Sequence, residues 1–205
     1  MKNILIFDYD GVIVDSFQIF MTNFIKACKE EGWNNIETKD DFLKIFEKNM
    51  YDGMYEIGMS KEEILRIIYR MRMALIKNQG KLKPFNGIHD VLKVLSTKNL
   101  LYIVTSNDTH VVENYLKSQK LFGFFKEIYG LDKGESKIEK ILQIKKINPN
   151  CKYFFIGDTK GDILEGIKSG VKTAAVGWGW HNKKQLKVVS PDFFIDTPED
   201  LFKII

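Results

Sequence analysis

Polar side chains follow directly after three short apolar runs of this chain, and their types suit the binding and transfer of a charged group. The polar residues at these three ends are Asp8 and Asp10; Thr105, Ser106 and Asn107; and Asp158 and Asp162. If the runs are parallel strands, their carboxyl ends meet at one edge of a sheet, which is where open α/β sheets bind ligands. Carboxylates that meet in a crevice repel one another unless a hard cation is present. Oxygen ligands, few in number, favour Mg²⁺.

The apolar runs have the length and composition of buried strands. Unbroken apolar stretches bounded by turn residues are typical of strands that are covered on both faces of a parallel sheet. They occupy residues 4–7, 100–104, 153–156 and 173–176, with a weaker final candidate at 193–195.

Helical patterns separate these runs. Helices are expected at residues 89–98, 111–116, 136–147 and 162–169, and a capped helix start at 197–200. The pattern in 136–147 places Ile138, Ile141, Leu142 and Ile144 on one face, with Ser136 as the cap. Strands that alternate with helices predict an α/β fold with a mainly parallel sheet.

Residues 16–81 break this alternation and show only helix signals. The expected helices cover 17–31, 39–49 and 60–78, and the segment Ser60-Lys61-Glu62-Glu63 has the form of a capping box. We therefore expect a helical insertion between the first strand and the rest of the sheet, which rejoins the sheet near Pro84.

Composition limits the class of protein. The 205 residues are 44% hydrophobic, which is enough for one cored domain with a smaller inserted one. The net charge of +4 is spread along the chain and forms no basic stripe of the kind that nucleic-acid binding favours. The first apolar run is too short for a signal peptide or a membrane span. The expectation is a soluble, cytoplasmic protein, by default a monomer, that binds neither nucleic acid nor a membrane.

Four segments, in order along the chain, resemble the motifs of haloacid dehalogenase-like phosphatases. Asp8-Tyr9-Asp10-Gly11-Val12 is similar to the first motif, and Ile103-Val104-Thr105-Ser106-Asn107 is similar to the second. Lys137, at the start of a helix, matches the third, and Gly157-Asp158-Thr159-Lys160-Gly161-Asp162 matches the fourth. The resemblance spans essentially the whole chain and is nearest to the phosphoglycolate phosphatase-like branch, whose tail the segment from Pro191 to Leu201 also resembles.

This resemblance implies two structural units. Residues 1–15 and 82–205 would form a Rossmann-like catalytic core, and residues 16–81 a small helical cap that closes over the substrate. The implied activity is the Mg²⁺-dependent hydrolysis of a small phosphorylated metabolite.

The resemblance also implies a role for each motif residue. Asp8 would attack the phosphoryl group and form an aspartyl phosphate, while Asp10 would serve as general acid and then general base. The groups implied to hold Mg²⁺ are the Asp8 side chain, the Asp10 main-chain carbonyl and Asp158, with Asp162 acting on the metal's waters or orienting Lys137. The groups implied to bind the phosphoryl oxygens are Thr105, Ser106, Asn107 and Lys137.

Other interpretations stay open. Each motif alone is common in turns and helix caps. An acid at Asp10 fits ester hydrolysis better than dehalogenation or phosphonate cleavage, but a sugar-phosphate mutase would keep it too. A catalytically silent binding protein on the same fold is a further alternative, although such a protein needs no general acid.

Some residues outside the motifs allow more than one interpretation. Arg66 and Arg70 could grip a second anionic group of the substrate, and Arg72 and Lys48 are equally available, although a solvated helix face is the favoured interpretation for all four. Trp178 and Trp180 could line the entrance of the site, contact the cap or serve only in packing.

Overall fold

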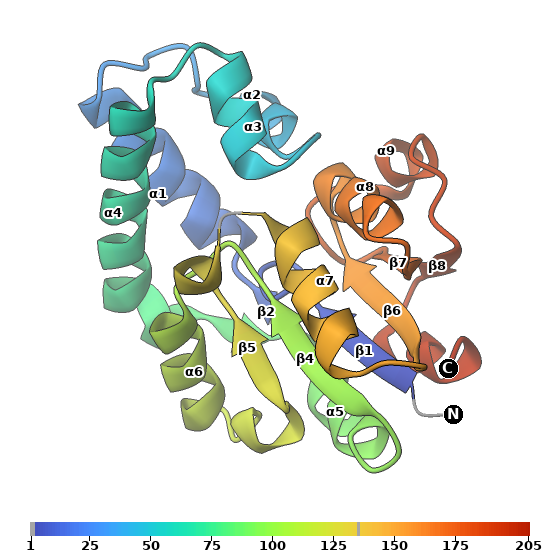
Figure 1. Cartoon of the computed structure of the whole chain (residues 1–205). Coiled ribbons are helices and arrows are strands. Elements are labelled where there is room, and N and C mark those ends of the chain that lie inside the picture. The colour runs from blue at the N-terminus through green and yellow to red at the C-terminus, as the bar shows by residue number, and fades with distance from the viewer. Residues whose placement is uncertain (1–2, 135) are drawn as a thin grey trace.

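The structure, a computed structural model, describes residues 3–134 and 136–205 and has an α/β architecture around a parallel sheet (Figure 1). The strand order is β5-β4-β1-β6-β7-β8, so the sheet extends from β1 in both directions. The strands are β1 (Asn3–Phe7), β4 (Leu100–Val104), β5 (Glu127–Tyr129), β6 (Lys152–Gly157), β7 (Lys172–Val176) and β8 (Phe193–Ile195). All five predicted runs are strands, and the prediction missed β5, which is too short to give an apolar pattern.

The predicted helical insertion lies between β1 and the rest of the sheet. Its helices are α1 (Phe17–Glu30), α2 (Lys39–Ile45), α3 (Met50–Glu56) and α4 (Lys61–Asn78). The helix expected over 39–49 ends at Ile45, because a new helix begins at Met50 with the Asn49 side chain accepting from Tyr51 N at 2.9 Å. The capping box at Ser60 is present. No described helix has the length and hydropathy needed to span a membrane.

A short antiparallel pair brings both ends of the insertion together. Strand β2 (Val14–Asp15) pairs with β3 (Lys83–Pro84), so the chain leaves and re-enters the sheet region at adjacent points. The insertion has a hydrophobic core in which Phe24, Phe42 and Ile67 are fully buried, and Trp180 from outside the insertion packs into it.

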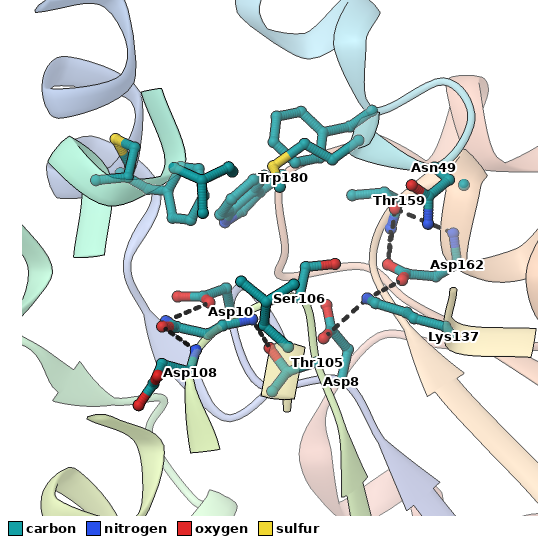
Figure 2. Close-up of a pocket in the computed structure, with 18 of the residues that line it drawn as sticks. Asp8, Asp10, Asn49, Thr105, Ser106, Asp108, Lys137, Thr159, Asp162 and Trp180 are labelled. Carbon is teal, nitrogen blue, oxygen red and sulfur yellow. Dashed lines mark hydrogen bonds and ion pairs between the residues drawn. The ribbon is translucent and has the colours of Figure 1, made fainter. Parts of the chain in front are cut away.

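The register of the sheet places the predicted site residues side by side. Phe7, the last residue of β1, is paired with both Ile103 and Ile156. The residues that follow these strands therefore emerge at one edge, where Figure 2 shows Asp8 and Thr105 close together. Helices α1–α4 stand beyond this edge in Figure 1.

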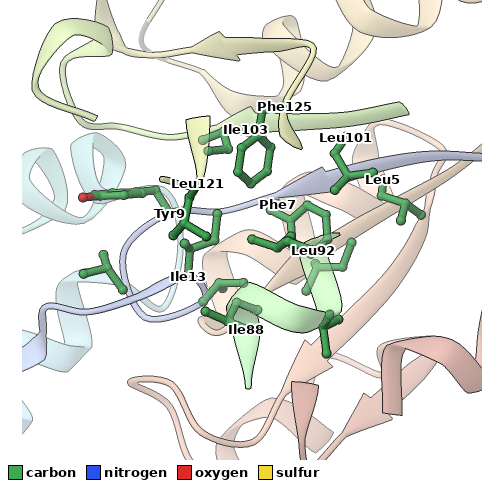
Figure 3. Packing of buried hydrophobic residues seen from close by; sticks show 14 of the residues in the cluster. Leu5, Phe7, Tyr9, Ile13, Ile88, Leu92, Leu101, Ile103, Leu121 and Phe125 are labelled. Atoms are coloured by element: carbon green, nitrogen blue, oxygen red, sulfur yellow. The ribbon is translucent and has the colours of Figure 1, made fainter. Parts of the chain in front are cut away.

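Helices cover both faces of the sheet and complete a three-layer, Rossmann-like fold. They are α5 (Ile88–Leu95), α6 (Thr109–Ser118), α7 (Lys137–Ile147), α8 (Lys160–Lys168) and α9 (Lys183–Lys187). Along β1, Leu5 and Phe7 pack in the cluster that α5 and α6 cover (Figure 3), whereas Ile4 and Ile6 pack in the cluster that α7 covers. Burial on both faces explains why the strand is an unbroken apolar run.

Smaller elements refine the helix predictions. The described 3-10 helices are η1 (Gln79–Lys81), η2 (Phe122–Phe124), η3 (Leu131–Lys133) and η4 (Pro198–Lys203), the last at the expected start after Thr197. Ser136 caps α7 by accepting from Ile138 N at 3.2 Å. The predicted apolar face of α7 was partly wrong, because Leu142 is exposed and the buried face carries Lys137 and Lys140 beside Ile141 and Ile144.

Candidate active site

A cavity of about 250 Å³ lies between the carboxyl edge of the sheet and the helical insertion. The structure brings the residues that the motif resemblance implied for the site to its wall: Asp8, Asp10, Thr105, Ser106, Asn107, Lys137, Asp158 and Asp162. Segments more than a hundred residues apart in the chain thus meet at one place (Figure 2).

Lys137 links two of the carboxylates. Its Nζ atom lies 3.0 Å from Asp8 Oδ1 and 2.6 Å from Asp162 Oδ1, and all three side chains are buried. Burial lowers the pKa of Lys137, but Asp162 and Asp8 more than offset this and raise it, so the ammonium group is charged. The nearby Lys133 instead pairs with Glu127.

The four aspartates have distinct protonation tendencies. Burial raises the pKa of Asp8 to about 7 although Lys137 lowers it, and burial also raises the pKa of Asp10. Burial together with Asp162 and Asp8 raises the pKa of Asp158 well above its usual range. The pKa of Asp162 is lowered, because Lys137 and Thr159 outweigh the effect of burial. A site with these shifts favours a bound proton or a bound cation.

Three of these carboxylates fit a cation site. Asp8, Asp158 and Asp162 each offer an oxygen within 4.8 Å of the others. The Oδ1 atom of Asp158 is buried and accepts no hydrogen bond from the described residues, while its Oδ2 atom accepts from Trp180 N at 2.7 Å. A buried carboxylate oxygen without a partner, in a cluster of oxygen ligands, suits a hard divalent ion.

Asp162 has both oxygens engaged. Its Oδ1 atom binds Lys137, and its Oδ2 atom accepts from Thr159 Oγ1 at 2.7 Å and from Thr159 N at 3.0 Å. These bonds form the capping box at the start of α8. Asp162 is therefore paired with Lys137, which is the contact that one of its two predicted roles requires.

The loop after β4 supports Asp10. Thr105 donates its N–H to Tyr129 O at 3.0 Å, and its hydroxyl accepts from Asn107 N at 3.0 Å. The Asn107 side chain donates to Asp10 Oδ2 at 3.3 Å, which leaves the buried Asp10 Oδ1 without a partner among the described residues. Ser106 lines the cavity beside them.

Gly11 permits the tight turn between the two acids and the helical insertion. Its φ of +79° lies in the left-handed region, and a Cβ atom there would collide with the Asp158 carboxylate and the Trp180 ring.

Several residues of the site gave no signal in the sequence. Glu165 Oε1 accepts from Lys137 N and from Asn49 Nδ2, both at 3.0 Å, and so joins α7, α8 and the helical insertion. Lys140 is fully buried behind Thr105. From the sequence alone, an isolated charged residue on a helix is expected to be exposed to solvent, because charged residues are seldom fully buried.

The start of α8 and the segment before α9 are bonded to the helical insertion. Gly161 N donates to Phe46 O at 3.1 Å, Lys160 Nζ lies 3.1 Å from Glu47 Oε1, and His181 Nε2 lies 3.2 Å from Leu43 O. Among the arginines of the insertion, Arg66 and Arg70 pair with Glu31 and do not line the cavity, whereas Arg72 does, as does Lys48.

Comparisons with known proteins agree with this geometry. Residues 5–176 match the family model for haloacid dehalogenase-like hydrolases. The pyrophosphatase PpaX of Anoxybacillus flavithermus is 28% identical, over 99% of this chain and 96% of that protein. The haloacid dehalogenase-like hydrolase SP0104 of Streptococcus pneumoniae is 26% identical with a TM-score of 0.77, over 99% of this chain and 98% of that one. A predicted phosphatase from Clostridium acetobutylicum shares the fold, with 22% identity and a TM-score of 0.85 over 100% of this chain and 98% of that one. The chain is therefore a hydrolase and belongs to the haloacid dehalogenase-like family.

Proposed function

We propose that this enzyme is a Mg²⁺-dependent phosphatase that hydrolyses a small phosphomonoester through an aspartyl phosphate on Asp8. The observation that carries the proposal is the buried Asp8 carboxylate, bonded to Lys137 and sharing a cavity with Asp10 and Asp158. Phosphoryl transfer needs a nucleophile, a general acid and positive charge next to the transferred group, and Asp8, Asp10 and Lys137 would supply them.

In the first step, an Asp8 oxygen attacks phosphorus while the bond from phosphorus to the leaving oxygen breaks. Asp10 gives its proton to that oxygen, so the alcohol leaves neutral. The raised pKa of Asp10, caused by burial, supports its holding a proton before the reaction.

In the second step, water attacks the aspartyl phosphate and the bond from phosphorus to Asp8 breaks. Asp10, now ionised, takes the proton of the water, and inorganic phosphate and free Asp8 result. Thr105, Ser106, Asn107 and Lys137 would bind the phosphoryl oxygens in both steps, and the ammonium of Lys137 would offset their charge.

The residues proposed to hold Mg²⁺ are Asp8, the main-chain carbonyl of Asp10 and Asp158, with Asp162 orienting Lys137. A bound Mg²⁺ would supply further positive charge next to the phosphoryl oxygens. The cluster of carboxylate oxygens and the unpartnered Oδ1 atom of Asp158 support this choice of cation.

We also propose that the chain forms two structural units with different roles. Residues 1–15 and 82–205 would form the catalytic core, and residues 16–81 the cap over the substrate. The apolar core of the helical insertion and the pairing of β2 with β3 support this division. We place the enzyme in the cytoplasm as a monomer that acts on a small phosphorylated metabolite.

The name of the relative PpaX favours inorganic pyrophosphate as a second candidate substrate. Attack by Asp8 would be the same, with phosphate in place of an alcohol as the leaving group.

Release of phosphate from p-nitrophenyl phosphate and from pyrophosphate, with Mg²⁺ and with EDTA, tests the proposal. We expect metal-dependent release from p-nitrophenyl phosphate by the wild type and by Asp15→Asn, since Asp15 is exposed, and none by Asp8→Asn. Turnover by a folded Asp8→Asn protein would exclude Asp8 as the nucleophile. Release that EDTA does not affect would exclude the metal.

A further inference from the structure

The cavity has a charged floor and an apolar wall. The floor includes Asp8, Asp10 and Lys137 at the edge of the sheet, as Figure 2 shows. The opposite wall comes from the helical insertion and includes Phe46, Met50, Leu65, Ile68 and Leu75. A substrate placed for in-line attack by Asp8 would have its leaving oxygen, and with it the alcohol part, on the side of phosphorus away from Asp8 and toward this wall.

Charge in the cavity is already unbalanced toward the negative. Among the described lining residues, the acidic ones are Asp8, Asp10, Asp108, Asp158, Asp162 and Glu165. The basic ones are Lys48, Arg72 and Lys137. With Asp10 protonated, a divalent cation would balance the remaining excess of acids, so the phosphoryl group of the substrate already brings the cavity to a net negative charge. A second anionic group on the substrate would therefore enter an unfavourable field.

Each of these basic residues already has an acidic partner. Lys137 binds Asp8 and Asp162, and Lys48 pairs with Glu56. Arg72 Nη2 lies 3.2 Å from Asp108 Oδ2, and Asp108 also caps α6. A substrate carboxylate or second phosphate would therefore have to share its cation with an acidic side chain.

One buried donor on the wall side lacks a partner among the described residues, and it is uncharged. Trp180 Nε1 is buried, and the indole ring stands between Phe20 and Phe46, at centroid distances of 5.1 and 4.9 Å. An indole N–H can bind an ether, hydroxyl or carbonyl oxygen, but it contributes no charge that would offset a second anion.

We propose that the substrate is the phosphate monoester of an uncharged, largely apolar alcohol, whose hydrocarbon part lies against Leu65, Ile68 and Leu75. This inference rests on the phosphatase function proposed above for the same cavity. Leu65 and Tyr69 are also largely exposed to solvent, so a longer hydrocarbon part continues outward along α4. Compact doubly anionic compounds, pyrophosphate included, are poor ligands by the same reasoning.

Binding of non-hydrolysable phosphonates separates this inference from catalysis. Isothermal titration calorimetry, with Mg²⁺ present, would compare 2-phenylethylphosphonate, ethylphosphonate and phosphonoacetate. Burial of one phenyl ring predicts roughly tenfold or tighter binding of the first than of the second. Phosphonoacetate should bind no more tightly than ethylphosphonate. Tightest binding of phosphonoacetate, or no gain from the phenyl ring, would overturn the inference.

A matched pair of variants locates the hydrocarbon part. Leu65 lines the cavity, whereas Met73, on the same helix, does not, and their exposed fractions are similar at 53% and 50%. Leu65→Asn should reduce the advantage of the phenyl ring by about threefold or more, and Met73→Asn should leave it unchanged. Equal effects of the two variants would overturn the placement against α4.

The two proposals can fail separately. If the phosphonates bind in the expected order but no ester gives phosphate release that depends on Asp8, the phosphatase proposal is wrong and the binding preference stands. If esters are hydrolysed and the order is reversed, only the inference about the alcohol is wrong.

Discussion

The Nζ atom of Lys140 donates to the main-chain carbonyl oxygen of Thr105 at 2.8 Å, and the lysine side chain is fully buried. This bond holds the proposed phosphate-binding threonine from behind, while Asn107 N binds its hydroxyl from the cavity side. Burial, together with the nearby charge of Lys137, lowers the pKa of Lys140 to about 8. Burial of a charged lysine costs free energy, which indicates that Lys140 serves to position the loop after β4.

Lys140→Met should therefore raise KM for a phosphate ester by about tenfold with a smaller change in kcat. Loss of the donor leaves the Thr105 carbonyl buried without its partner, a cost of about 1–3 kcal/mol that loosens the loop. Steady-state kinetics of p-nitrophenyl phosphate hydrolysis measure both constants. Lys146→Met is the matched control, since Lys146 is exposed on the same helix. Equal KM values in the two variants would exclude the positioning role.

The free energy of unfolding should depend on pH in a way that reports the lowered pKa of Lys140. Its pKa falls from the ordinary 10.5 to about 8 in the folded state, so between these values the unfolded chain binds more protons. The free energy of unfolding of the wild type, relative to Lys140→Met, should rise with pH across this window by on the order of 2 kcal/mol. Urea denaturation of both proteins near pH 7.5 and near pH 10 measures the difference. A difference that stays constant would show that Lys140 is not buried as a cation.

Asp10→Asn should separate the two chemical steps. We expect steady-state phosphate release to fall about 10²-fold or more, because no group remains to deprotonate the attacking water. The nitrophenolate leaving group needs little protonation, so a burst of about one equivalent should survive. Stopped-flow absorbance records the burst. A variant that keeps the wild-type steady-state rate would contradict the acid and base roles of Asp10.

Mg²⁺ should stabilise the fold through Asp158. A ligand at about 100 times its Kd adds roughly 2.7 kcal/mol to the free energy of unfolding, which raises Tm by roughly 5 °C in a chain of this size. Thermal melts followed by circular dichroism, with MgCl₂ and with EDTA, measure the shift. Asp15→Asn should keep the full shift and Asp158→Asn should lose most of it. An equal shift in both variants would place the ion elsewhere.

Gly161→Ala should disturb the contact between α8 and the helical insertion. A Cβ atom at Gly161 would collide with the Lys48 carbonyl oxygen, next to the bond from Gly161 N to Phe46 O. We expect kcat/KM to fall about tenfold or more and the insertion to become more sensitive to limited proteolysis. Gly123→Ala is the control, since a Cβ atom there meets open space. Unchanged kinetics in Gly161→Ala would show that this contact does not matter for turnover.

The sequence alone determined the alternation of strands and helices. Strands covered on both faces must be apolar at every position, so β1 and β4 are visible as unbroken runs, and the polar residues after them mark the edge of the sheet. The order of the motifs was enough to predict that Asp8, Thr105 and Asp158 follow strands. Their roles in catalysis stay predictions that the experiments above address.

Only the tertiary structure decided which charged side chains turn inward. The partners of Lys140 and Glu165 lie 35 and 116 residues away in the chain, and no local pattern reports such distances. No local pattern shows either that Trp180 packs among phenylalanines of the helical insertion. Periodicity depends on neighbours along the chain, whereas the burial of a charge depends on partners that the fold brings to it.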